Sequence, residues 1–304
     1  MSAEKLILCS GLVCIDVIQT CEQFPIEDSD QRCIDYHLQR GGNASNNCTV
    51  LRKLGSNCEF FGTISRSSSF TRFIIEDYKK HNIVFNNIVY HDDCEAPLST
   101  IIINNQNGSR TIIHANKNLP ELKFDDFRKL DLLNYSWIHF EGRNVLETIK
   151  MLEYVKKWKS DTRNSLTVSV EVEKPKSDII NLIHFADVVF ISKDFATFNG
   201  YKNMEETVHG FSQKIKTRPI LICAWGEDGA IGLTSDGVTV KSKAFPPPKV
   251  VDTLGAGDTF VASVIFSLNN GRTLEQSLAN GCKIAGRKVG LKGFDSLENF
   301  IKDI

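Results

Sequence analysis

The strongest constraint on the fold is an alternation between short buried strands and helices. Four short apolar runs have the length of buried strands: residues 6–15, 166–172, 187–191 and 220–225. Stretches with helical periodicity lie between and after them, at residues 146–158, 204–215, 259–269 and 274–289. Strands that alternate with helices form a parallel sheet covered on both faces. The sequence therefore predicts an α/β fold, with a mainly parallel sheet in a three-layer α/β/α core.

Two segments depart from this pattern. Residues 33–39 and 98–115 carry polar and apolar residues in strand-like order, and the second segment has two arms around Asn-Gln-Asn-Gly. Strands inserted there do not easily join a parallel sheet. We expect a small separate sheet, a lid or dimer surface, from residues of about 17–40 and 96–117. No repeat, low-complexity block or linker divides the chain, so residues 1–304 are expected to form one domain.

Composition and charge exclude several classes of protein. Hydrophobic residues make up 41% of the chain and charged residues 24%, as in an ordinary globular protein rather than a disordered one. A net charge of -1 provides no long-range field for nucleic acid or an anionic membrane, so neither is an expected partner. No apolar run approaches the roughly 18 residues that a spanning helix needs.

The cysteines and the start of the chain bear on the compartment. The nine cysteines are odd in number and lack the paired spacing of a zinc or redox site. The first residues make a poor signal peptide and a good buried strand. Together these features predict a reducing, cytoplasmic location.

The sharpest motif is the turn at residues 252–260. Gly255, Ala256 and Gly257 allow a tight turn whose N–H groups point into the positive end of the next helix, which makes an anion hole. Asp258 follows, where it can cap the helix and face a bound anion. For a lone motif, capping alone is the better interpretation. A carboxylate beside a phosphate is tolerable when it accepts a proton from an attacking hydroxyl, which favours phosphoryl transfer.

A second motif lies at residues 40–47. Gly42 precedes two amides, Asn43 and Asn46, within one turn of an expected helix start. Amides donate and accept hydrogen bonds, which suits sugar hydroxyls. A helix cap rich in asparagine is about equally compatible with this segment alone.

The two motifs together resemble the paired signatures of the ribokinase-like (PfkB) carbohydrate kinases. The early one reads Gly-Gly-Asn-x-x-Asn and the late one Asp-Thr-x-Gly-Ala-Gly-Asp-x-Phe, and the resemblance covers the whole chain. Residues 39–46, 137–144, 170–175 and 244–248 resemble the family members that act on fructose. The resemblance implies ATP-dependent phosphorylation of fructose to fructose 1-phosphate, by in-line transfer assisted by a general base.

The resemblance also implies roles for individual residues. Asp258 would be the base, and the amides of Gly255, Ala256 and Gly257 would hold the transferring phosphoryl group. The sugar would be bound by Asp16, Gly42, Asn43, Asn46 and Asp258. Asp16 would end the first strand, where ligands bind in open α/β sheets.

The nucleotide would be bound by a second set of residues. Arg110 would reach the ATP phosphates from the lid, although a lone arginine on a hairpin is usually only solvated. The segment Gly226, Glu227, Asp228 and Gly229 would close over the nucleotide, and residues 245–247 would form an apolar wall for the adenine. Asp28 would reach a partner subunit's sugar site, because lid sheets of this family often pair into homodimers; an exposed loop acid is the default interpretation.

The resemblance is incomplete at the metal. Many family members carry Asn-x-x-Glu to organise magnesium through water, whereas this chain has Ser-Lys-Asp-Phe at residues 192–195. The metal ligands are therefore left open. Mg²⁺ is expected as the counter-ion of ATP, and K⁺ activation would act through carbonyls near Asp252 and Thr253.

Two other functions remain as alternatives. A kinase of another sugar or of a nucleoside would carry the same signatures. A non-catalytic sugar or nucleotide sensor could keep the fold, but such a sensor would be marked by loss of Asp258, which is present.

Overall fold

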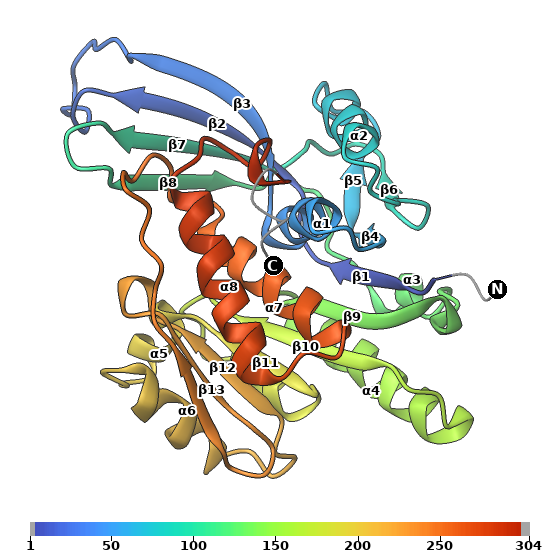
Figure 1. Cartoon of the computed structure of the whole chain (residues 1–304). Coiled ribbons are helices and arrows are strands. Elements are labelled where there is room, and N and C mark those ends of the chain that lie inside the picture. The colour runs from blue at the N-terminus through green and yellow to red at the C-terminus, as the bar shows by residue number, and fades with distance from the viewer. Residues whose placement is uncertain (1–3, 299–304) are drawn as a thin grey trace.

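An eight-stranded sheet forms the centre of the computed structural model, which describes residues 4–298 (Figure 1). Its strands lie in the order β14 (Thr239–Ser242), β13 (Ala230–Leu233), β12 (Ile220–Ala224), β11 (Val188–Ile191), β10 (Thr167–Val172), β9 (Tyr135–Glu141), β1 (Leu6–Ser10) and β4 (Cys58–Phe61). The six strands from β12 to β4 are parallel, and β13 and β14 extend the sheet antiparallel at one edge.

Helices cover both faces of this sheet. Alternate residues of β1 show the two layers, because Ile7 packs with residues of α1 (Asn43–Lys53), α7 (Ala256–Asn269) and α8 (Leu274–Val289), whereas Leu8 packs with residues of α4 (Val145–Thr162) and α6 (Met204–Ser212). The remaining helical elements are α2 (Thr71–Lys80), α3 (Phe124–Phe127), α5 (Lys193–Phe198) and the 3-10 turns η1 (Leu132–Asn134), η2 (Ile179–His184) and η3 (Gly226–Asp228). The predicted three-layer α/β fold is confirmed.

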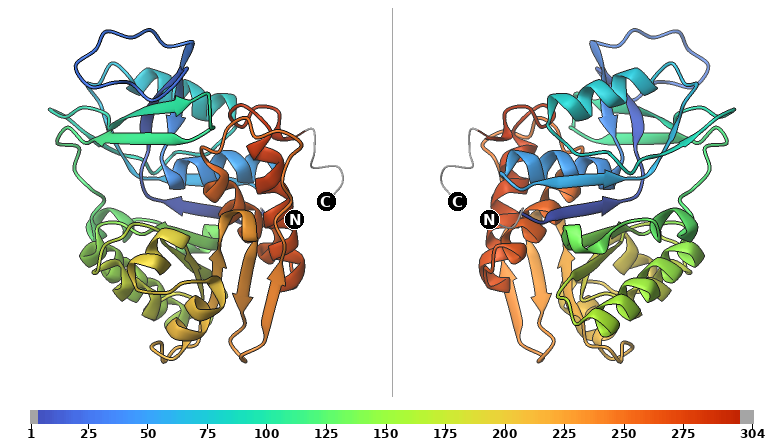
Figure 2. Two further views of the ribbon diagram at one scale, coloured as in Figure 1. Left: turned by 90° about the vertical axis from the view of Figure 1, so that its left-hand side faces the viewer. Right: turned by 90° about the vertical axis from the view of Figure 1, so that its right-hand side faces the viewer.

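A second sheet lies beyond one end of the central sheet, over the start of α7 and the end of α8 (Figures 1 and 2). It has four strands in the order β3 (Asp35–Gly41), β2 (Cys14–Cys21), β7 (Leu98–Asn104) and β8 (Arg110–Ala115). We call it the lid sheet. A short pair, β5 (Thr63–Ser65) and β6 (Val89–His91), stands apart from both sheets.

The expected strand at residues 6–15 is wrong, because the chain leaves the central sheet part-way along it. β1 ends at Ser10, and β2 of the lid sheet begins at Cys14. In the segment between these two strands, the Leu12 N–H donates a hydrogen bond to Glu141 Oε2 over 2.8 Å. A Cβ added to Gly11 would lie 2.5 Å from the same oxygen. Asp16 consequently lies in the lid sheet and not at the end of a core strand.

The helices predicted from periodicity are present, with shifted ends. α7 begins at Ala256, three residues earlier than expected, and α6 ends at Ser212 rather than at residue 215. No helix within residues 4–298 is long and apolar enough to cross a membrane.

Candidate active site

The turn before α7 has a backbone that only glycine adopts easily. Gly255 has φ 73°, and a Cβ added there would lie 2.5 Å from the Phe294 ring. Gly255 is also the residue that caps the helix, so the expectation that Asp258 serves as the N-cap is wrong. Asp258 lies in the first turn of α7, and its side chain points into the protein instead of back to the helix start.

The Asp258 carboxylate is buried against α1. Asn46 Nδ2 donates to Asp258 Oδ2 at 2.7 Å, and Asn47 Nδ2 donates to the Asp258 carbonyl at 3.0 Å. Burial raises the pKa of Asp258 well above the ordinary value, and the neighbouring Glu171 raises it further. The two sequence motifs therefore meet in space, and the carboxylate that they share is more basic than a surface aspartate.

The start of α1 brings the lid sheet to the same place. Gly42 has φ 97°, and a Cβ added there would lie 2.3 Å from the Leu12 carbonyl oxygen. A Cβ added to Gly41 would lie 2.1 Å from Asp16 Oδ2, so the Asp16 side chain rests directly on this glycine. Burial raises the pKa of Asp16. Asp16, Gly42, Asn43, Asn46 and Asp258 thus form one cluster at the junction of the lid sheet with α1 and α7.

Arg110 reaches the turn before α7 from the lid sheet. Its Nη1 donates to Thr253 Oγ1 at 2.7 Å. The turn itself is fixed by Asp252, whose carboxylate accepts from Lys288 Nζ at 2.7 Å and from the Leu254 N–H at 2.8 Å. A cationic side chain and a rigid turn therefore flank the start of α7.

The three amides of the predicted anion hole differ in availability. The Ala256 N–H already makes a long hydrogen bond, 3.3 Å, to the Thr253 carbonyl oxygen. Gly257 faces open space, since a Cβ added there would have no neighbour within 4 Å. A ligand at this turn would have to replace the internal hydrogen bond of the Ala256 N–H. No side chain would block its approach to Gly257.

The segments expected to bind the nucleotide make contacts of their own. Gly226, Glu227 and Asp228 form η3 at the carboxyl end of β12, and Gly229 has φ 91°, with the Ser242 carbonyl 2.1 Å from an added Cβ. Residues 245–247 pack on α8, where a Cβ added to Gly286 would lie 1.9 Å from the Phe245 carbonyl oxygen. Within residues 4–298, no recorded hydrogen bond joins either segment to Asp258 or Arg110.

Asp28 lies away from the site of its own chain. It occupies the exposed loop between β2 and β3, and its φ is 56°. No recorded hydrogen bond or ion pair in the described part of the chain links it to the cluster around Asp258.

Sequence reasoning missed three acidic residues at the site. Glu141 ends β9, Glu171 lies near the end of β10, and Glu173 follows it. Asn43 Nδ2 donates to Glu173 Oε2 at 2.7 Å and approaches Glu171 Oε2 at 3.4 Å. Burial, with repulsion from Glu173 and Glu141, raises the pKa of Glu171 to about 8. The available signal was their place at the carboxyl ends of parallel strands.

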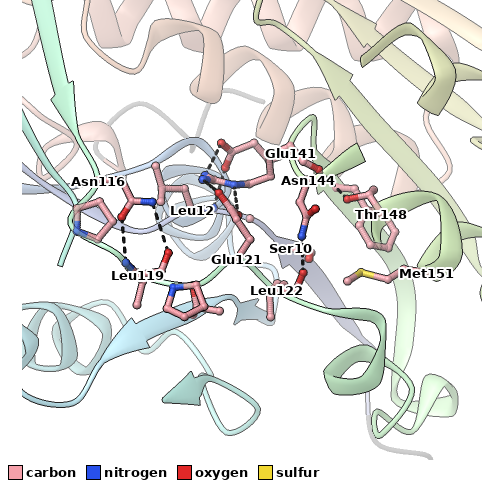
Figure 3. Close-up of a pocket in the computed structure, with 16 residues that line it drawn as sticks. Ser10, Leu12, Asn116, Leu119, Glu121, Leu122, Glu141, Asn144, Thr148 and Met151 are labelled. Carbon is pink, nitrogen blue, oxygen red and sulfur yellow. Dashed lines mark hydrogen bonds and ion pairs between the residues drawn. The ribbon is translucent and has the colours of Figure 1, made fainter. Parts of the chain in front are cut away.

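A pocket lies on the other side of Glu141 (Figure 3). Several of its polar side chains are already paired. Arg143 contacts Glu121 at 2.5 Å and Glu141 at 3.2 Å, and Asn144 Nδ2 donates to the Leu122 carbonyl at 2.8 Å. These side chains are therefore not free to bind a ligand without breaking internal contacts.

Comparisons with known proteins decide the family. The model of the pfkB family carbohydrate kinases matches residues 4–298. This chain belongs to that family. It is 45% identical to the ketohexokinase of Mus musculus, over 97% of this chain and 99% of that protein. The ribokinases of Giardia lamblia and Arabidopsis thaliana have the same fold, with TM-scores of 0.83 and 0.82, 17% identity each, and 98% of both chains covered.

The Arabidopsis ribokinase structure is a complex with ribose and ATP. At its level of identity the likeness establishes the fold alone. The cluster around Asp258 is consequently interpreted from its own geometry.

Proposed function

We propose that this chain catalyses ATP-dependent phosphorylation of fructose to fructose 1-phosphate. The observation that carries this proposal is the buried Asp258 carboxylate, which has one oxygen hydrogen bonded to Asn46 at 2.7 Å and lies at the start of α7. The 45% identity to a ketohexokinase over nearly the whole chain supports fructose as the sugar.

The reaction follows from these positions. Asp258 accepts the proton of the sugar 1-hydroxyl as the hydroxyl oxygen attacks the γ-phosphorus. A bond forms between that oxygen and phosphorus, the bond to the bridging oxygen breaks, and ADP leaves in line. The N–H groups of Gly255, Ala256 and Gly257 would stabilise the charge on the transferring group. The raised pKa of Asp258 suits it to accept this proton.

The remaining assignments divide between sugar and nucleotide. Asp16, Gly42, Asn43 and Asn46 would bind the sugar hydroxyls, which is supported by their clustering with Asp258. Arg110 would bind the ATP phosphates, and its contact with Thr253 at 2.7 Å supports this role. Residues 226–229 and 245–247 would hold the rest of the nucleotide, with the adenine against the second segment.

Mg²⁺ would enter with ATP as part of the substrate, mostly retaining its water. The described residues contain no group of three or more His, Cys, Asp or Glu side chains arranged to hold a metal. Potassium does not fit at Asp252 itself, because the Lys288 ammonium already contacts its carboxylate at 2.7 Å and its carbonyl at 3.0 Å. K⁺ activation stays a prediction, tested by comparing initial rates in KCl and NaCl, and no step above uses it.

We also propose that the chain is one kinase domain and forms a homodimer through the lid sheet. Apolar side chains on the outer face of the lid sheet support this, and Asp28 would then approach the partner's site from its loop. A cytoplasmic location is supported by the nine cysteines, all of which are free thiols.

A coupled assay of ADP release tests the function. With fructose, ribose and adenosine as acceptors, we expect kcat/KM to be highest for fructose and the product to be fructose 1-phosphate by NMR. Preference for ribose or adenosine would assign another kinase of the same family. Binding of sugar or ATP without turnover of any acceptor would indicate a sensor.

A further inference from the structure

A buried polar stripe runs along the central sheet toward the site. Trp137 and His139 lie on β9 and Ser169 and Glu171 on β10, on the sheet face that α1 and α7 cover. His139 is paired directly with Ser169 in the strand register, and Glu141 with Glu171. The exposed fraction is 0% for both His139 and Ser169. Buried polar groups of this kind need partners, so the direction of each hydrogen bond can be worked out.

The first hydrogen bond can be assigned from Trp137, because an indole N–H can only donate. Trp137 Nε1 donates to Ser169 Oγ at 2.8 Å, and the same oxygen lies 2.8 Å from His139 Nδ1. Ser169 Oγ has one proton to donate, and among the described residues its hydrogen-bond partner besides Trp137 is His139 Nδ1, so the hydroxyl proton is assigned to the Nδ1 lone pair. Burial lowers the pKa of His139 to about 4, so the ring is neutral and its one proton lies on Nε2.

The proton on Nε2 faces the site. His139 Nε2 is buried without a hydrogen-bond partner, and it lies 3.9 Å from Glu171 Oε2. The Asn43 amide nitrogen lies 3.4 Å from the same oxygen. Two donors therefore converge on one oxygen of Glu171. The imidazole contact would have to shorten by about 1 Å, or include one water, to become a hydrogen bond.

The orientation of Asn43 follows from its partners. Glu173 Oε2 accepts from Asn43 Nδ2 at 2.7 Å and from Lys174 Nζ at 2.8 Å. The Glu173 oxygen accepts from both the lysine and Asn43, so the Asn43 atom that faces it is the amide nitrogen. The carbonyl oxygen Oδ1 is the part of Asn43 that these contacts leave for a ligand.

We propose that Trp137, Ser169, His139 and Glu171 form a directed hydrogen-bonded chain that positions Asn43, so that Asn43 Oδ1 accepts a hydrogen bond from a substrate hydroxyl. His139 and Glu171 are positioning residues that act through Asn43. The site then favours a substrate with a hydroxyl group opposite Asn43 Oδ1. A substrate with a carbonyl or deoxy centre at that position would bind more weakly. This proposal rests on the proposed function. The charged or titratable groups around Glu171 are His139, Glu141, Glu173, Lys174 and Asp258.

Two substitutions at His139 test the chain. Gln places an amide near the position of Nε2 and keeps a donor for Glu171, whereas Asn reaches only the level of Nδ1. We expect His139→Asn to raise the KM for fructose about tenfold, with the KM for ATP unchanged, and His139→Gln to stay near the wild type. The control is His81→Asn, a histidine that pairs with Asp77 on α2. Thermal unfolding of each variant identifies those that are misfolded.

A double-mutant cycle separates positioning from general damage. If His139 acts through Asn43, then His139→Asn causes no further rise in the KM for fructose when Asn43→Ala is already present. Additive effects, or equal increases in the KM for fructose and ATP, would overturn the proposal. Absence of fructose turnover by the wild type would instead overturn the proposed function, and this proposal with it.

A measurement on the wild-type protein needs no variant. In ¹⁵N spectra of histidine-labelled protein at neutral pH, His139 should show a protonated Nε2 and an unprotonated Nδ1. The opposite tautomer, or a charged ring, would contradict the proposed direction of the hydrogen bonds and with it the proposal.

Discussion

Asp258 combines two properties that oppose each other. Its carboxylate is buried, which raises its pKa, yet it keeps a hydrogen bond from Asn46 that favours the ionised form. Burial is the larger effect, with Glu171 adding to it. At the scale of a single residue, the site therefore supplies a base stronger than an exposed aspartate.

Replacing Asp258 with Asn tests this role directly. Asn keeps the shape of the side chain but cannot take up a proton, so we expect kcat to fall by about 10²- to 10⁴-fold. The affinities for sugar and ATP, measured by calorimetry, should change little. A turnover within a few fold of the wild type would remove Asp258 from the chemistry.

The pH dependence follows from the same carboxylate. The base must be ionised, so kcat/KM should fall as the pH drops through the raised pKa of Asp258, well above the ordinary value of about 4. Glu171 raises the pKa of Asp258, so Glu171→Gln should lower that pKa and move the acidic limb to lower pH. Asp35→Asn, at an exposed acid paired with Lys292, is the control and should leave the profile in place.

At the scale of elements, the start of α1 packs closely against the backbone at Leu12, because Gly42 has no side chain. Gly42→Ala should lower stability by about 1–3 kcal/mol from backbone strain, with a further loss from the contact to the Leu12 carbonyl. Gly55 is the matched control, because its φ is 94° but a Cβ added there meets nothing within 4 Å. Chemical denaturation should show Gly42→Ala to be less stable than Gly55→Ala; equal stabilities would mean that the close contact is relieved at no cost.

The strand β8 brings Arg110 to the turn before α7. Arg110→Ala should raise the KM for ATP severalfold, with a smaller effect on the KM for fructose, because the guanidinium lies beside the proposed phosphate site. Arg72→Ala, at an exposed arginine on α2, is a control for the loss of a surface charge. A larger effect on fructose than on ATP would assign Arg110 to the sugar.

Sequence reasoning found the site residues that lie within the two short motifs. The meeting of Asn46 with Asp258 was expected, because the family resemblance assigns both residues to the sugar. The chain from Trp137 to Glu171 was not found, because its residues share a face only through the register of two strands that are distant in sequence. The break at residues 11–13 was missed because both halves are apolar and periodicity does not report a change of sheet.

At the scale of the whole molecule, the outer face of the lid sheet is unusually apolar. Asp16 faces the core, and the strand register places Leu38, Tyr36 and Ile113 on the opposite face of the sheet. The exposed fraction is 44% for Leu38, 71% for Tyr36 and 58% for Ile113. This is the surface that the proposed homodimer would cover.

A charge placed on this face should separate the subunits. We expect Leu38→Lys to shift the mass measured by light scattering from dimer to monomer. Leu146→Lys on α4, where the leucine is 77% exposed, should leave the mass unchanged. A wild-type protein that is monomeric at micromolar concentration would contradict the proposed dimer.

Only residues 11–13 join β1 to β2, so Asp16 is carried by the lid sheet while Asp258 belongs to the core. The angle between the lid sheet and the central sheet therefore sets the distance between the Asp16 and Asp258 carboxylates, which would both bind the same sugar. A sugar bound by both carboxylates would hold the two sheets at one spacing, and a substitution at residues 11–13 would change the affinity for the sugar without contacting it.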